Sequence, residues 1–171
     1  MRNRVLLMAG TASVLGACLV LMGPCPILVV QVNRELVPAE LDLVERINRG
    51  DDLNEIKSMI ELDPESATKP NMNGDYPLHA AARHNRVDVL KLILETGADV
   101  NQKSLSFPHH TPLHVAVSEG KVDIAKLLLE SGAKLDATDI AGLTVRDYLP
   151  PDDAAMRELL EEHERKTKIQ D

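Results

Sequence analysis

The stretch TPLHVAVSEGKVDIAKLLLESGAKLD, residues 111–136, repeats a pattern that first appears as YPLHAAARHNRVDVLKLILETGADVN at residues 76–101. The two copies lie 35 residues apart and share a Pro-Leu-His opening, a central Val-Asp, a Lys-Leu step and a closing Gly-Ala. A fixed period of roughly 20–50 residues is the signature of a repeat protein, in which each unit is too small to bury its own apolar face. Neighbouring units must therefore stack, and the repeat decides the fold.

Each copy is typical of two short helices joined by a tight turn. Thr111 can cap the first helix, and Pro112 suits its first position, where a missing N–H group has no cost. Leu113 begins an apolar face that continues three and four residues later. Gly120 permits a left-handed turn between the helices, and Asn85 takes that place in the earlier copy because Asn tolerates this conformation. A glycine ends the second helix of each copy.

Two weaker units flank this pair. Upstream, residues 41–65 show two short helical patterns in the matching places, with Gly50 lying 35 residues before Asn85. Downstream, GLTVRDYL at residues 142–149 begins a degenerate copy. Atypical ends are expected because terminal repeats face water on one side.

The whole pattern resembles the ankyrin-repeat family, in which a T-P-L-H helix start is followed by a second helix ending in L-L-x-x-G-A and then D-V-N. The resemblance implies an all-α solenoid of about four stacked helix-turn-helix units with finger loops. We place the domain at residues 34–165, with units at about 40–73, 74–108, 109–141 and 142–165. The residues expected to form the motif are Pro77, Leu78, His79, Thr111, Pro112, Leu113, His114, Gly97 and Gly132.

Two positions depart from the family pattern. Tyr76 stands where the other copy has the capping Thr111, so that cap is either lost or passes to Asp75. The link from Asn101 to Thr111 is also two residues longer than the corresponding link in the next unit. This link is the protruding finger of such folds, and here residues 102–110 carry Phe107, the only phenylalanine of the chain.

The C-terminal segment is predicted to be a capping helix. Asp152 and Asp153 suit its N-terminus, where the helix dipole favours negative charge. Met156, Leu159 and Leu160 form its apolar face, and Glu162 and Lys166 are spaced for an ion pair. We expect residues 166–171 to form a frayed tail.

The first 33 residues predict an export or membrane signal. Residues 5–32 form an uncharged run of 28, preceded by Arg2 and Arg4, and about 20 apolar residues suffice to span a bilayer. The positive charges before the run would leave the first residues in the cytoplasm and send the body across. Three interpretations remain open: an uncleaved transmembrane anchor, at roughly Val5 to Gly23 and followed by an apolar linker up to residue 33, a cleaved signal peptide, or a bacterial lipoprotein. The last rests on Leu15-Gly16-Ala17-Cys18, which resembles a lipobox with Cys18 as the lipidated residue.

The charge of the body argues against nucleic-acid binding. The chain carries a net charge of −8, and residues 35–171 hold 16 Lys and Arg against 27 Asp and Glu. Such an acidic surface repels phosphate backbones. Both cysteines, Cys18 and Cys25, lie in the N-terminal segment, so the body holds no thiolate metal site and no catalytic thiol.

The histidines are expected to be structural. By the family resemblance, His79 and His114 bond the threonine hydroxyl and the backbone of adjoining turns. His110 and His114 are four residues apart, a spacing that suits zinc on one helix. Pro112 starts the helix between them, however, so they do not share a regular helical face. A metal or enzymatic site at His109, His110 and His114 remains the alternative.

We expect no catalysis and no cofactor, and we predict a binding module for another protein. The first helices and fingers of a solenoid present an extended concave face. The residues expected to contact the partner are Arg83, His84, Lys103, Leu105, Phe107, His109, His110, Ser118 and Glu119. The module would be tethered to a membrane by its N-terminus and lie outside the cytoplasm, in a bacterial periplasm or envelope; an exported, host-directed effector is the second alternative. Neither nucleic acid nor a small-molecule substrate is expected.

Overall fold

The computed structural model describes residues 42–106 and 108–170, which belong to one compact unit. The predicted N-terminal signal with Cys18, and Phe107 of the finger, lie outside the described residues. Among the helices of the described ranges, none combines the length and apolarity needed to cross a bilayer.

The regular secondary structure of the described residues is helical, apart from one isolated bridge between Thr138 and Thr144. This architecture confirms the all-α solenoid that the repeat predicts. The elements in chain order are α1 (Leu43–Arg49), α2 (Leu53–Leu62), η1 (Pro64–Ala67), α3 (Pro77–Arg83), α4 (Val87–Glu95), α5 (Pro112–Ser118), α6 (Val122–Glu130), η2 (Val145–Tyr148) and α7 (Ala154–Gln170).

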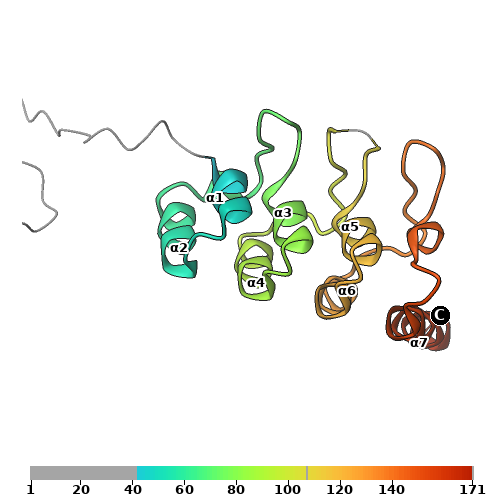
Figure 1. Cartoon of the computed structure of the whole chain (residues 1–171). Helices are drawn as coiled ribbons and strands as arrows, with labels where there is room; N and C mark the ends of the chain where they lie inside the picture. Colours follow the sequence, from blue (N-terminus) through green and yellow to red (C-terminus); the bar gives the residue numbers. More distant parts are fainter. Residues whose placement is uncertain (1–41, 107, 171) are drawn as a thin grey trace, which may run out of the picture. The chain divides into compact units, whose positions relative to one another are not determined.

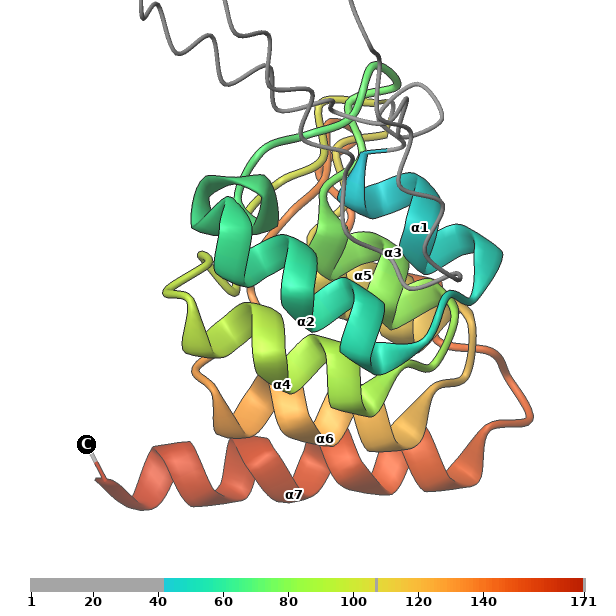
Figure 2. The ribbon, with the colours of Figure 1, turned by 90° about the vertical axis from the view of Figure 1, so that its left-hand side faces the viewer.

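The helices stack as pairs in a row (Figure 1). The first helices α1, α3 and α5 form one layer, and the second helices α2, α4 and α6 form another, as the view along the row shows (Figure 2). The connections between successive pairs rise on one side as fingers (Figures 1 and 2). We call residues 70–75 the first finger, 102–110 the second finger and 137–143 the third finger.

Local chemistry explains the tight turns inside each pair. Gly50, Asn85 and Gly120 all adopt positive φ, at 82°, 56° and 64°. The prediction that Asn85 replaces a glycine in the left-handed turn is therefore confirmed. Pro77 and Pro112 occupy the first turns of α3 and α5, where a proline is pre-organised for the helix.

The core consists of aliphatic side chains, as the near absence of aromatic residues requires. Large buried residues such as Ile56, Leu90 and Leu128 come from the second helices. The middle helix α3 instead presents Ala80, Ala81 and Ala82, which are fully buried. Helix α3 packs against α1 on one side and α5 on the other, and small side chains let its backbone approach both neighbours.

The last unit differs from the others. Its first helix is a single 3-10 turn, η2, and its second, α7, spans 17 residues. The predicted face of α7 is confirmed, because Met156 and Leu160 are buried and Asp153 accepts a hydrogen bond from the N–H group of Met156 at 2.9 Å. The predicted pair of Glu162 and Lys166 forms at 2.7 Å. Helix α7 continues to Gln170 and so includes residues 166–170 of the predicted tail.

Candidate partner-binding surface

The histidine of the TPLH copy forms hydrogen bonds at the start of its own helix. His114 is fully buried, and its Nδ1 lies 2.8 Å from the hydroxyl of Thr111 and 3.3 Å from the Thr111 backbone nitrogen. Because a backbone N–H group can only donate, Nδ1 accepts and the neutral ring carries its proton on Nε2. The ring thereby satisfies donors at the start of α5 that no helical carbonyl can reach.

The histidine of the YPLH copy ties two units together. Nε2 of His79 donates to the carbonyl oxygen of His110 at 2.8 Å, across 31 residues of sequence. Nδ1 of His79 is buried and has no hydrogen-bond partner among the described residues. Tyr76 makes no side-chain hydrogen bond that caps α3, so of the two outcomes left open by the sequence, the cap is lost. Asp75 instead accepts from Arg83 at 2.8 Å.

The end of the second finger packs into the following unit. The ring of His110 stacks on His114 with centroids 5.3 Å apart, and both rings meet the edge or face of Tyr148. The hydroxyl of Tyr148 donates to Asp139 at 2.5 Å. This contact lowers the pKa of Asp139 below its usual range and raises that of Tyr148. His110 was predicted on the partner surface; it is half-buried, and its ring packs against His114 and Tyr148.

Burial sets the electrostatics of this cluster. It lowers the pKa of His79, His110 and His114 below the ordinary value of 6.5, because an apolar surrounding disfavours the charged ring. All three rings are therefore neutral at pH 7. Neutral imidazoles pack against Tyr148 without the desolvation cost of a buried charge.

The arrangement of these histidines does not resemble a metal centre. Within residues 42–106 and 108–170, no three His, Cys, Asp or Glu side chains gather around a common point. The rings of His110 and His114 are stacked in nearly parallel planes, inclined by only 4°. His109 adopts a left-handed backbone with φ of 66° at the turn of the second finger.

The second finger folds into a closed loop that is bonded to the first. The N–H group of Ser104 donates to the carbonyl of His110 at 2.8 Å, the same oxygen that His79 reaches. The Ser104 hydroxyl and the N–H group of Leu105 both donate to the carbonyl of Gly74, at 3.0 and 2.8 Å. A Cβ atom at Gly74 would lie 2.8 Å from the Cβ of Leu105. The lengthened finger thus packs directly against the first finger through Ser104, Leu105 and Ser106.

In all three fingers, a side chain accepts hydrogen bonds from backbone N–H groups a few residues later in the chain. These turns were not predicted from the sequence. Asn71 accepts from the N–H groups two and four residues later, and Asp139 does the same in the third finger. In both, a glycine follows at the third position with φ of 78°. Ser104 accepts from the N–H group of Ser106 in the second finger. The spacing of Asn or Asp three residues before glycine is the signal that could have identified these turns.

The residues expected on the concave face differ in their exposure and in their contacts with other residues. Ser118 and Glu119, at the end of α5, are exposed. Arg83 is held by Asp75, and His84 lies 3.1 Å from the side chain of Asn48 in the preceding unit. On the second finger, Lys103 donates to the carbonyl of Thr138 at 2.6 Å, and Leu105 is 60% exposed. The residues predicted to form the repeat motif are not on this surface. Pro77, Leu78, Pro112 and Leu113 are buried, and Gly97 and Gly132 have positive φ angles of 87° and 91°.

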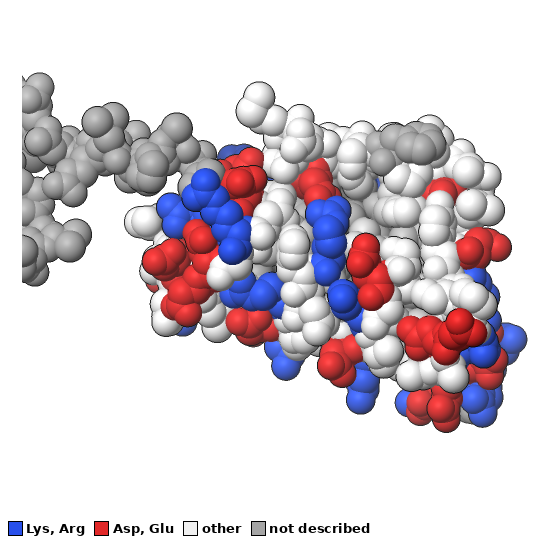
Figure 3. All heavy atoms as spheres, in the orientation of Figure 1, with Lys and Arg blue, Asp and Glu red and all other residues white. Residues whose placement is uncertain are grey.

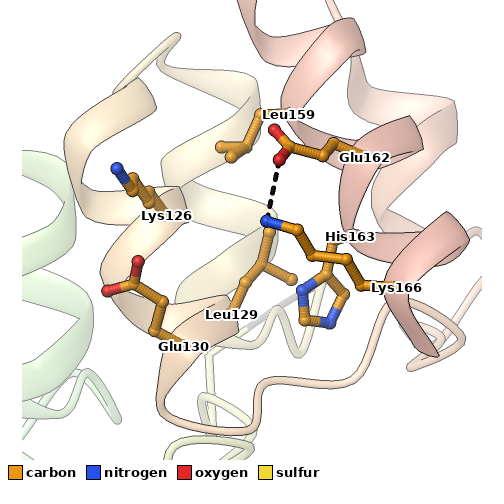
Figure 4. Close-up of a pocket in the computed structure, with 7 residues that line it drawn as sticks. All are labelled: Lys126, Leu129, Glu130, Leu159, Glu162, His163 and Lys166. Atoms are coloured by element: carbon orange, nitrogen blue, oxygen red, sulfur yellow. Dashed lines mark ion pairs between the residues drawn. The ribbon is translucent and has the colours of Figure 1, made fainter. Parts of the chain in front are cut away.

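A shallow hollow of about 120 Å³ lies between α6 and α7 (Figure 4). The Glu162–Lys166 ion pair is part of its lining, and the hydrogen bond from Lys166 lowers the pKa of Glu162. The hollow is on the outer layer of the stack, away from the fingers (Figures 1 and 4). It is lined by Lys126, Leu129, Glu130, Leu159, Glu162, His163 and Lys166.

Comparison with known proteins agrees with the geometry. The family model for ankyrin repeats, in three copies, matches residues 43–139. This range covers the three helix pairs from α1 to α6. A search of curated proteins found no match.

Proposed function

Because the chain belongs to the ankyrin-repeat family, we propose that it is a non-catalytic module that binds a protein partner through its concave face and second finger. Proteins of this family generally act as binding modules. The first helices and the fingers form a continuous side of the stack (Figure 2), and a solenoid of this kind offers an extended surface to a partner.

The pre-organised second finger is the observation that carries this proposal. Its backbone is closed by the bond from Ser104 to His110 and fixed to the first finger through Gly74. A loop held in one conformation loses little entropy when a partner binds. Lys103 and His109 lie on the described parts of this hydrogen-bonded finger, and Phe107 belongs to it by sequence.

The concave face supplies the polar part of the proposed surface. Arg83 is oriented by Asp75, with 40% of its side chain exposed, and Glu119 is exposed one unit further along. Arginine and aromatic residues dominate the binding energy of protein interfaces. Arg83 and Phe107 are therefore the proposed anchors, with His84, Ser118 and Glu119 around them.

The proposal includes a membrane tether and a location outside the cytoplasm. Its support is the uncharged run of residues 5–32 behind Arg2 and Arg4. A transmembrane anchor and lipidation at Cys18 both provide such a tether. In Cys18→Ser, lost membrane retention would identify lipidation and unchanged retention would identify the anchor. Recovery of the wild-type chain in the culture medium would contradict both.

The binding surface is tested by affinity capture from envelope extracts with the full chain. We expect Phe107→Ala and Glu119→Lys each to reduce the amount of one captured partner. Lys91→Glu, on the exposed side of α4, is the control for a charge change of similar size and should capture it normally. Equal capture by all four proteins would contradict the proposed surface. Zinc bound stoichiometrically to the purified chain would instead favour the metal site at His109, His110 and His114.

A further inference from the structure

The tips of the three fingers form a row of exposed apolar side chains. Met72 in the first finger is fully exposed, Leu105 and Ile140 in the next two are each 60% exposed, and Leu143 is 41% exposed. Hydrogen bonds join the tips, from the N–H group of Leu105 to Gly74 and from that of Ile140 to Pro108 at 3.2 Å. We call this row the tip edge.

The tip edge is almost free of charge. The segments 70–74, 104–110 and 140–144 contain no Asp, Glu, Lys or Arg, and this side of the molecule is largely white in the charge view (Figure 3). The flanking charges are already engaged: Lys69 with Glu65, Asp75 with Arg83, and Lys103 with the Thr138 carbonyl. Asp139 is buried under its bond from Tyr148. An uncharged edge with apolar side chains stands out on a body that is otherwise acidic.

The position of the chain entry indicates what covers this edge. Helix α1 begins on the finger side of the stack in both ribbon views (Figures 1 and 2). Nineteen residues, 24–42, lie between an anchor that ends at Gly23 and the start of α1. Fully extended, they reach at most about 65 Å. The tether therefore joins the domain on its finger side, within reach of the bilayer.

We propose that the tip edge contacts the lipid surface, with Met72, Leu105, Ile140 and Leu143 inserted among the headgroups. This inference rests on the membrane tether proposed above, and it assigns Leu105 to lipid instead of the protein partner. Four side chains on the tips of three loops suit a surface that deforms around them. Stable membrane contact usually needs two signals, and the tether and the tip edge together supply them. The concave face then lies beside the membrane and remains open to a protein.

The acidic body restricts the lipid chemistry. Anionic headgroups would repel it, since exposed like charges raise the energy of approach. The bilayer that suits this edge is therefore zwitterionic, with insertion depending on apolar contact. Added salt should leave the contact unchanged because no charge pairing drives it.

The test uses tryptophan, which the chain lacks. Full-length chains carrying Leu105→Trp, Ile140→Trp or, as a control on α4, Lys91→Trp are reconstituted into phosphatidylcholine vesicles. We expect brominated lipids to quench the fluorescence at positions 105 and 140, and iodide in the water to lose its quenching there. At position 91 we expect the opposite pattern. Met72→Ser with Ile140→Ser, added to Leu105→Trp, should abolish the quenching by brominated lipid; unchanged quenching would mean that the tryptophan itself drives insertion and would overturn the proposal.

The remaining outcomes separate the two proposals. If the chain floats with the vesicles and both tips stay open to iodide, the tether stands and the lipid contact is overturned. If the tips are shielded from iodide without quenching by brominated lipid, a second copy covers them, and the lipid contact is again overturned. If the wild-type chain does not float with the vesicles, both the membrane tether and the lipid contact of the tip edge are overturned.

Discussion

The two copies of the PLH motif hold the same histidine by different hydrogen bonds. In the later copy, Nδ1 of His114 binds Thr111 and secures the start of its own helix. In the earlier copy, Tyr76 offers no hydroxyl at that place, and His79 instead reaches the His110 carbonyl of the next finger. The difference separates two tasks that a single motif combines. Capping a helix and tying neighbouring units are distinct contributions, and each can be removed alone.

Removing either imidazole ring should cause the largest change in the free energy of unfolding. His114→Ala loses the bonds to Thr111 and the contacts with His110 and Tyr148, and we expect it to lower the free energy of unfolding by about 3 kcal/mol. His79→Ala loses one bond between units and a buried ring, with an expected cost of about 2 kcal/mol. Urea denaturation measures both. If neither variant shifts the midpoint, the histidines are not structural ties.

The contact between the first two fingers gives the next largest effect. Gly74→Ala would place a Cβ atom 2.8 Å from that of Leu105 and 2.9 Å from the Ser106 nitrogen, at a positive φ, so we expect a loss of about 2 kcal/mol. Gly97→Ala is the matched control, because its φ is also positive but no atom lies within 4 Å. Its expected loss is about 1 kcal/mol. Equal losses in thermal unfolding would show that the fingers do not press against each other.

Exchanging the residue at the capping position of either copy should change the free energy of unfolding by a smaller amount. Thr111→Val keeps the shape of the side chain and removes the hydroxyl that binds His114, and we expect a loss of about 1 kcal/mol. Tyr76→Thr places a hydroxyl beside the unpartnered Nδ1 of His79 and should add about 1 kcal/mol, less the lost contact of the tyrosine ring. Equilibrium unfolding measures both changes. Destabilisation by Tyr76→Thr would show that packing of the tyrosine outweighs the cap.

The lowered pKa values of the buried histidines predict a pH dependence. Because His79, His110 and His114 bind protons less readily in the folded than in the unfolded chain, stability is complete above the unfolded pKa of 6.5. It falls as the pH decreases from there toward the lower folded values. We expect the urea midpoint to decrease between about pH 7 and 5, and His110→Asn to flatten that decrease. A urea midpoint that rises as the pH decreases would contradict the predicted loss of stability.

The sequence predicts the frame of this fold because the frame depends on local chemistry. The left-handed turn at Asn85 and the buried face of α7 follow from residues within one unit. The inward packing of His110 and the bond from Tyr148 to Asp139 depend on contacts between units. A repeat pattern shows that a finger exists, but it does not show which side a ring on that finger faces. The stacking of the half-buried His110 ring on His114 could not be predicted for this reason.

The binding surface was harder to predict for a related reason. Leu105 stands out in the sequence only as part of a lengthened finger, whereas the structure aligns it with Met72 and Ile140 across three units. These residues are more than 30 positions apart in the chain, so no local pattern links them. Exposure and alignment emerge only after the units have stacked.

The central claim, that the histidines of the repeated motif are structural ties and not reactive groups, is tested most directly by nitrogen NMR of the imidazole rings. The account predicts that His79 and His114 both stay neutral at pH 7 with the proton on Nε2, and that the Nε2 proton of His79 is hydrogen-bonded to the carbonyl of His110. A proton on Nδ1 in either ring, or a ring that gains its proton above pH 6.5, would contradict it.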